Sequence, residues 1–170
     1  MEIPEELANL EANSGIYAVW MLFQHLGLDP DIEQLKEVCH YVEGDGTTTI
    51  GLAVGLKKFG LNVEFTTDAD EDLQDQEKRS YAEAETINLK MSASIRYQDI
   101  QNAFNANKFV IVYYDTLEGL GNHSLVYDIN DEEISFFDSF DAMTQDIFEQ
   151  QRAVDGICRQ AIIVEVSHYS

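Results

Sequence analysis

The chain has 170 residues, 45% of them hydrophobic and 11% aromatic, and its 32 acidic residues outnumber 10 basic ones to give a net charge of -22. This length and composition predict a single globular domain over residues 1–170 and exclude a disordered tail. The charge excludes binding to a nucleic acid backbone and favours basic partners, although it is equally typical of a solvated surface.

Targeting signals and cofactor motifs are missing from the sequence. No apolar run reaches the ~20 residues of a membrane span, and the acidic residues 1–6 lack the basic and apolar regions of a signal peptide. We therefore expect a cytoplasmic protein with no membrane span. The two cysteines, Cys39 and Cys158, are too few for a disulfide framework and lack zinc-site spacing, so buried free thiols are expected. Without metal-ligand spacing or a glycine-rich phosphate loop, we expect no metal and no cofactor.

The N-terminal half of the chain is predicted to be helical, because its apolar residues recur at helical spacing. The periodicity predicts a mostly buried helix over 14–27, a second helix over 31–42 and a third that ends at Gly60. Residues of capping type precede the second and third helices: Asp31, and Thr47 or Thr48.

The C-terminal half is predicted to be mostly strands. A strand is expected at 61–65, and the acidic stretch 68–85, which has few apolar side chains, is expected to be an exposed loop or insertion. A helix over 94–107 follows. The remaining predicted elements are three strands, a helix and a last strand: 109–114, 123–129, 134–137, 142–153 and 161–166. Helices first and an antiparallel sheet second indicate an α+β fold.

A small polar segment, Asn13-Ser14-Gly15, stands at the start of the first predicted helix. Asn and Ser are good N-cap residues, because their oxygens accept the free N–H groups of the first turn. The positive end of a helix dipole is also where papain-like cysteine peptidases hold their nucleophile. Taken alone, this segment favours a cap over a nucleophile.

Two further residues can be brought toward Ser14. A hairpin turn predicted at 130–132 places His123, at the start of one strand, and Asp138, at the end of the next, at the same open end. An Asp beside a His fixes the imidazole tautomer, so the three residues could act as nucleophile, base and orienting group. Each of them singly also fits a structural role, as a cap, a loop contact or a turn residue.

Short motifs along the chain match a known family in their order and spacing. They are Asn13-Ser14-Gly15, Gly27-Leu28, Gly46-Thr47-Thr48, Phe59-Gly60-Leu61, His123-Ser124-Leu125-Val126 and Asp138. On these motifs, residues 8–166 resemble the bacteriocin-processing double-glycine peptidases and their stand-alone relatives, within the papain-like cysteine peptidases. The resemblance implies a bacterial hydrolase with a papain-like fold, N-terminal helices on an antiparallel sheet, and catalytic residues at Ser14, His123 and Asp138.

The chain departs from the family pattern at three places. Ser14 stands where the family has its nucleophilic Cys, Ala8 stands at the oxyanion-hole Gln with Asn9 as a substitute one residue on, and Ser139 stands where Pro often follows Asp138. A hydroxyl is not ionised by a helix dipole and an imidazolium as a thiol is, so it needs a true general base. Loss of an oxyanion donor costs a factor of about 10²–10³ in rate.

Three explanations of Ser14 follow, in order of preference. The chain is a catalytically degenerate relative that binds a peptide or protein partner, which could be basic, in its residual cleft. Alternatively, a natural Cys was changed to Ser by design, or Ser14 is a working nucleophile of a peptidase or acyl-transfer enzyme. The missing Gln favours the first, because a designed change would explain position 14 alone. An enzyme predicts a Ser14–His123 contact of hydrogen-bond length, and an accidental match to the family predicts that the two residues lie far apart.

Overall fold

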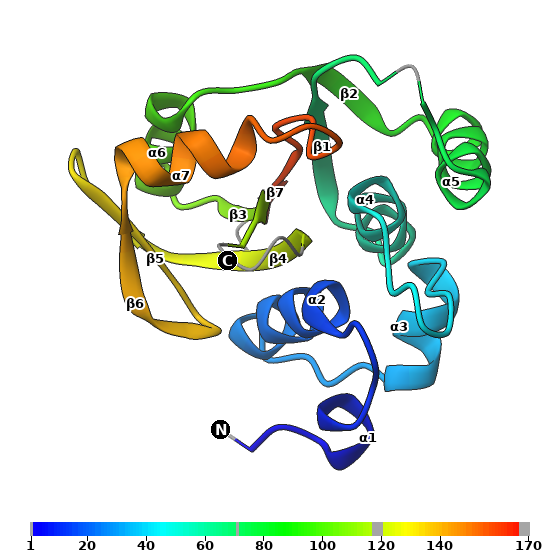
Figure 1. The fold of residues 1–170 in the computed structure, drawn as a ribbon. Helices are drawn as coiled ribbons and strands as arrows, with labels where there is room; N and C mark the ends of the chain where they lie inside the picture. The colour runs from blue at the N-terminus through cyan, green and yellow to red at the C-terminus, as the bar shows by residue number, and fades with distance from the viewer. Residues whose placement is uncertain (1, 71, 117–120, 167–170) are drawn as a thin grey trace.

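The computed structural model of the protein describes residues 2–70, 72–116 and 121–166. Within these ranges, seven helices and a seven-stranded sheet form an α+β fold (Figure 1). The helices are α1 (Glu5–Ala8), α2 (Ser14–His25), α3 (Ile32–Val38), α4 (Thr49–Lys58), α5 (Asp75–Thr86), α6 (Tyr97–Asn105) and α7 (Gln145–Arg152). The strands are β1 (Asn62–Thr67), β2 (Lys90–Ala93), β3 (Phe109–Asp115), β4 (Gly121–Ile129), β5 (Glu133–Phe136), β6 (Ser139–Thr144) and β7 (Ala161–Glu165).

The sheet has the strand order β2-β1-β7-β3-β4-β5-β6. Neighbouring strands run antiparallel except for β1 and β2, which pair in parallel at one edge, with Glu64 opposite Lys90. The parallel pair arises because α5 forms the crossover between these two strands. The predicted sheet is therefore confirmed, with one parallel edge pair that the sequence had not indicated.

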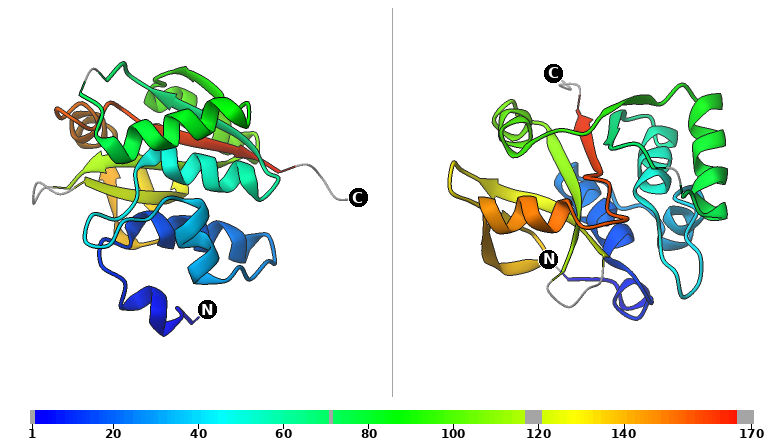
Figure 2. Two further views of the ribbon diagram at one scale, coloured as in Figure 1. Left: turned by 90° about the vertical axis from the view of Figure 1, so that its right-hand side faces the viewer. Right: turned by 45° about the horizontal axis from the view of Figure 1, so that its top comes forward.

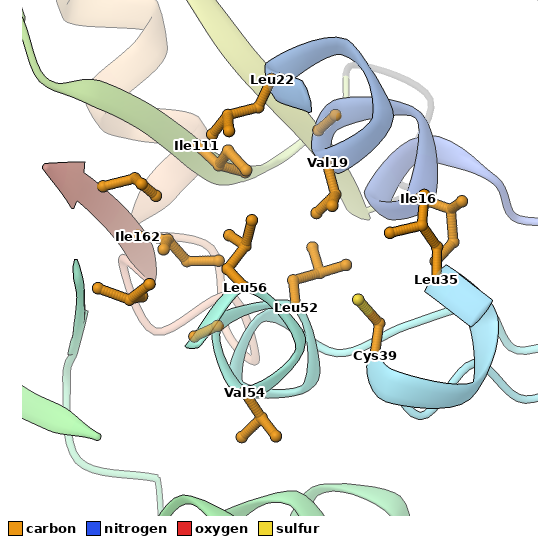
Figure 3. Packing of buried hydrophobic residues seen from close by; sticks show 14 of the residues in the cluster. Ile16, Val19, Leu22, Leu35, Cys39, Leu52, Val54, Leu56, Ile111 and Ile162 are labelled. Carbon is orange, nitrogen blue, oxygen red and sulfur yellow. The ribbon is translucent and has the colours of Figure 1, made fainter. Parts of the chain in front are cut away.

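Two apolar cores cover opposite faces of the sheet. Because successive strand residues point to opposite faces, Ile111 joins the core formed with α2 and α4, whereas Val110 and Val112 join the core formed with α6 and α7. Figure 3 shows side chains of the first core: Ile16, Val19, Leu22, Leu35, Cys39, Leu52, Leu56, Ile111 and Ile162. In the right-hand view of Figure 2, α6 and α7 lie on one side of the sheet, and α3, α4 and α5 lie on the other.

Most predicted elements are present, the helices with shorter ends and three of the strands with longer ones. The predicted helix over 142–153 begins only at Gln145, because residues Ser139–Thr144 form β6 and pair with β5. The edge strand β2 was also missed. All four of its side chains are exposed, so the sequence carries no buried alternation to reveal it.

The acidic stretch 68–85 is largely helical, so the expected exposed loop is a wrong prediction there. Helix α5 packs on α4, and its N-terminus is closed by a capping box in which Gln74 and Glu77 take part. Its inward face is mixed: Ala84 and Tyr81 pack on the first core, whereas Ser80 and Glu83 both contact the imidazole of His40. Two apolar residues among polar ones give only a weak form of the apolar period from which helices are predicted. Residue 71 of this stretch lies outside the described residues.

The sequence predicted no membrane span, and the length and apolar character of the helices bear on this prediction. In the part of the chain that the structure describes, no helix combines the length and the apolar character needed to cross a bilayer.

Candidate functional site

Ser14 is the first residue of α2 and connects that helix to the sheet. Its hydroxyl oxygen accepts the backbone N–H of His123 in β4, at 3.1 Å. The expected side-chain cap is not formed, because the amide of Asn13 donates instead to the carbonyl of Leu7, at 2.9 Å. The hydroxyl therefore binds a strand 109 residues away and leaves the first turn of its own helix uncapped.

Glycines allow the segment before α4 to pack directly on the start of α2. A Cβ at Gly15 would lie 2.1 Å from the hydroxyl oxygen of Thr47, and a Cβ at Gly46, where φ is +80°, would lie 2.7 Å from the carbonyl oxygen of Ala12. Only a residue without a side chain permits both approaches. Thr48 caps α4 by accepting the N–H of Gly51 at 3.1 Å, which confirms one of the two predicted caps.

The imidazole of His123 is buried next to the start of α4. Its Nε2 lies 2.9 Å from Oγ1 of Thr49, the first residue of α4, and its ring stacks on Tyr113 with 4.3 Å between ring centroids. Burial lowers the pKa of His123 from 6.5 to about 3, because the charged form loses its hydration. Among the described residues, no hydrogen bond joins this imidazole to the side chain of Ser14 or of Asp138.

Asp138, just after β5, binds the two neighbours of His123 in β4. Its Oδ2 accepts from Nδ2 of Asn122 at 3.3 Å and from Oγ of Ser124 at 3.1 Å. Because side chains alternate along a strand, these two residues lie on the face opposite the imidazole. The hydroxyl of Tyr114 joins the same group, 3.0 Å from Nδ2 of Asn122 and 2.9 Å from Oγ of Ser124.

Ser14, His123 and Asp138 therefore lie in one region, as predicted from the hairpin. The imidazole of His123 does not hydrogen-bond to either of the other two side chains. An open cavity of about 300 Å³ lies there, lined by Ile3, Asn13, Ser14, Tyr17, Asn122 and Asp138. We call it the Ser14 cleft. It contains a serine hydroxyl and a carboxylate, but the amide of Asn122 stands beside them in place of an imidazole.

The architecture around the cleft is that of a known fold. No protein-family model and no curated protein matches the chain. Among solved structures, it is similar to the crystal structure of the peptidase domain of Streptococcus ComA, a bi-functional ABC transporter involved in a quorum-sensing pathway, with a TM-score of 0.56 over 91% of each chain and 15% sequence identity. The protein has the papain-like fold. This confirms the predicted fold class, and at this identity the likeness extends to the fold alone.

The predicted oxyanion substitute lies apart from the cleft. Asn9 is exposed and follows the last residue of α1, Ala8. Among the described residues that line the cleft, Ala8 and Asn9 do not appear, whereas Asn13 does.

Neither native thiol is poised for chemistry. Burial raises the pKa of Cys39 to about 12. Burial, together with Asp70 and Asp68, raises the pKa of Cys158 to about 11. Both thiols are therefore protonated at neutral pH, and a thiol in that form is a poor nucleophile. No group of three or more His, Cys, Asp or Glu side chains within the described ranges is placed to hold a metal ion.

Residues of the site that were missed from the sequence include Thr49, Tyr17 and Asn122. Asn122 carried a partial signal, because strand alternation requires that His123 and its neighbours face opposite sides of the sheet. Thr49 carried no such signal, since its partner is 74 residues away.

Proposed function

We propose that this protein is a catalytically degenerate papain-like domain that binds a peptide or protein partner in the Ser14 cleft. One observation carries the proposal: the Ser14 hydroxyl meets the backbone N–H of His123, while the imidazole of the same residue binds Thr49. A serine nucleophile requires a base within about 2.6–3.2 Å of its hydroxyl. The backbone N–H is a donor and cannot remove that proton.

The electrostatics support the same proposal. A base with a pKa near 3 gains little by taking a proton from a serine hydroxyl at neutral pH. A helix dipole stabilises a thiolate at its N-terminus, but a hydroxyl has too high a pKa to ionise there without a base. With Ala8 where the family has Gln, the site also lacks the expected oxyanion donor.

The second candidate is a peptidase or acyl-transfer enzyme that uses residue 14 as its nucleophile. In its favour, Ser14 begins a buried helix in a papain-like fold and shares its cleft with Asp138. For this reaction, the His123 imidazole would have to bring Nδ1, which makes no hydrogen bond among the described residues, within reach of the Ser14 hydroxyl.

The test compares the native chain with Ser14→Cys, using hydrolysis of peptides and thioesters read by mass spectrometry. We expect no turnover from either protein, because the change supplies a thiol without supplying a base. Ser14→Cys/His123→Gln serves as the matched control. Turnover by Ser14→Cys that is lost in this double variant would overturn the proposal and establish a competent cysteine peptidase site in which position 14 alone is changed.

Binding is tested separately with isotope-labelled native protein and short acidic, neutral and basic peptides. We expect at least one peptide class to shift the backbone amide resonances of residues 13–17 and 122–123, which surround the cleft. Shifts that occur only elsewhere on the molecule would contradict binding in the cleft.

A further inference from the structure

The hydrogen bonds around Asp138 determine which polar atoms remain available in the Ser14 cleft. A carboxylate can only accept, so the side of Asn122 that contacts Asp138 is its NH₂ group. Every hydrogen bond of the Asn122 side chain within the described residues uses Nδ2. Its Oδ1 is therefore an unused acceptor on a residue that lines the cleft.

Asp138 and Ser14 add two further acceptors. Both bonds to the Asp138 carboxylate from described residues involve Oδ2, which leaves Oδ1 of this exposed side chain available. The Ser14 oxygen accepts one N–H, from His123, and a hydroxyl oxygen has a second lone pair. Of the six residues that line the cleft, Asp138 alone carries a formal charge at neutral pH. The residues that line the cleft therefore combine one negative charge with three available acceptors.

The walls of the cleft add an apolar contact. Ile3 lies on it with 43% of its surface exposed, and Tyr17 is a second apolar contact in the lining. Burial, followed by the charge of Asp138, raises the pKa of Tyr17, so its hydroxyl stays neutral. An aliphatic side chain and a neutral aromatic ring suit a chain of methylene groups that ends in a cation.

Resting on the proposed function, we infer that the Ser14 cleft binds a lysine side chain of the peptide partner. A lysine ammonium has three N–H donors and no acceptor, which matches the available oxygens of Asp138, Asn122 and Ser14. Its four-carbon stem packs on Ile3 and Tyr17, and Asp138 is the charged anchor. Arginine is a poorer match, because its planar guanidinium favours a bidentate pair with two oxygens of one carboxylate, and here Asp138 Oδ2 is already occupied.

The experiment must separate this site from the general attraction of a chain with net charge -22 for any cation. The probes are four peptides measured by calorimetry on the full chain, identical and uncharged apart from the groups named next. They carry lysine, Nε-acetyl-lysine or norleucine at the centre, each with a blocked amino terminus, or norleucine with a free amino terminus. We expect the lysine peptide to bind about tenfold more tightly than the acetyl-lysine and norleucine peptides, as a charge-assisted hydrogen bond allows.

Two variants locate the site. Asp138→Asn should abolish the preference for lysine. Asp141→Asn, which removes an exposed carboxylate three residues along that does not line the cleft, should keep it. Because the ligand series is measured on the native chain, the inference can be tested even if a variant fails to fold.

The outcomes distinguish this inference from the proposal on which it rests. Equal binding of the lysine and norleucine peptides would overturn the inference and leave peptide binding in the cleft intact. Equal binding of lysine and free amino terminus would overturn the lysine assignment in favour of an α-ammonium site. No binding of any peptide would overturn both the inference and the proposed peptide binding on which it rests. An equal loss of the preference for lysine in both variants would overturn the inference, because it would show attraction to the overall charge.

Discussion

The Ser14 cleft and the network beneath α5 contain the same three kinds of residue in opposite arrangements. In the cleft, Ser14 and Asp138 are accessible, but the imidazole of His123 faces Thr49. Beneath α5, His40 lies between Ser80 and Glu83, with Nδ1 2.7 Å from the serine oxygen and Nε2 2.5 Å from the carboxylate. These three residues are hydrogen-bonded in the order found in a catalytic triad.

Access distinguishes the two regions. Ser80 is completely buried, so no substrate carbonyl can approach its oxygen. The hydrogen-bonded network beneath α5 is therefore structural. It holds the helix to the rest of the domain, because Glu83 also pairs with Lys58 of α4, and Gln76 donates to the carbonyls of His40 and Gly46. Catalysis by such a triad needs both the connected hydrogen bonds and access for substrate. The network beneath α5 has only the hydrogen bonds, and the Ser14 cleft has only the access.

The largest effect is expected beneath α5. His40→Ala leaves the buried hydroxyl of Ser80 without its partner and creates a cavity, so we expect a loss of about 3 kcal/mol in the free energy of unfolding. Urea denaturation measures it. His25→Ala, at an exposed histidine of α2, is the matched control and should cost less than about 1 kcal/mol. Equal stability of His40→Ala and the native chain would show that the network does not hold α5.

A smaller effect is expected where α2 meets the segment before α4. Gly15→Ala places a methyl group against Thr47 Oγ1, which is buried without a hydrogen-bond partner among the described residues, and should cost about 2 kcal/mol by overpacking.

Thr47→Ala alone should be nearly neutral, because it removes an unsatisfied hydroxyl. Combined with Gly15→Ala, it should recover more than half of the loss, which a double-mutant cycle by urea denaturation would detect. Additive costs would contradict the close approach that positions Ser14.

The smallest effect, over the single pH unit that the comparison uses, is a pH dependence of stability from His123. Because its pKa falls from 6.5 to about 3 on folding, the unfolded chain binds a proton between these pH values that the folded chain does not. The free energy of unfolding should therefore decrease as pH falls below 6.5, with a contribution of up to about 1.4 kcal/mol per pH unit.

His123→Gln keeps a polar group near Thr49 and cannot titrate, so it should lack this contribution. Denaturation of both proteins just above and about one unit below pH 6.5 gives the comparison, since most carboxylates stay ionised in that window. The same slope in both proteins would contradict a buried neutral imidazole.

The sequence predicted the fold well where apolar residues recur with a regular period. The buried helix after Ser14, the strands over 109–137 and the turn at 130–132 together bring His123 near Asp138, and the structure contains them. It did not predict α5, because polar contacts of Gln76, Ser80 and Glu83 supplement a short apolar contact in holding that helix.

The direction of the His123 side chain could not be predicted from the sequence, for a different reason. A shift of one residue in strand register exchanges the two faces of the sheet, so motif spacing alone cannot say whether His123 or Asn122 faces Asp138. The deciding contacts come from Thr49 and Tyr113, which belong to other elements of the fold. Residues 117–120, just before β4, lie outside the described residues.

The most direct test of the account is an NMR titration of the His123 imidazole in the native chain and in Ser14→Cys. We expect this ring to stay neutral from about pH 8 to about pH 5 in both proteins, in keeping with its pKa near 3 and its contact with Thr49. A His123 pKa at or above 6.5 that rises further in Ser14→Cys would indicate a thiolate–imidazolium pair. That result would contradict the central claim that the histidine of this cleft is not available as a base.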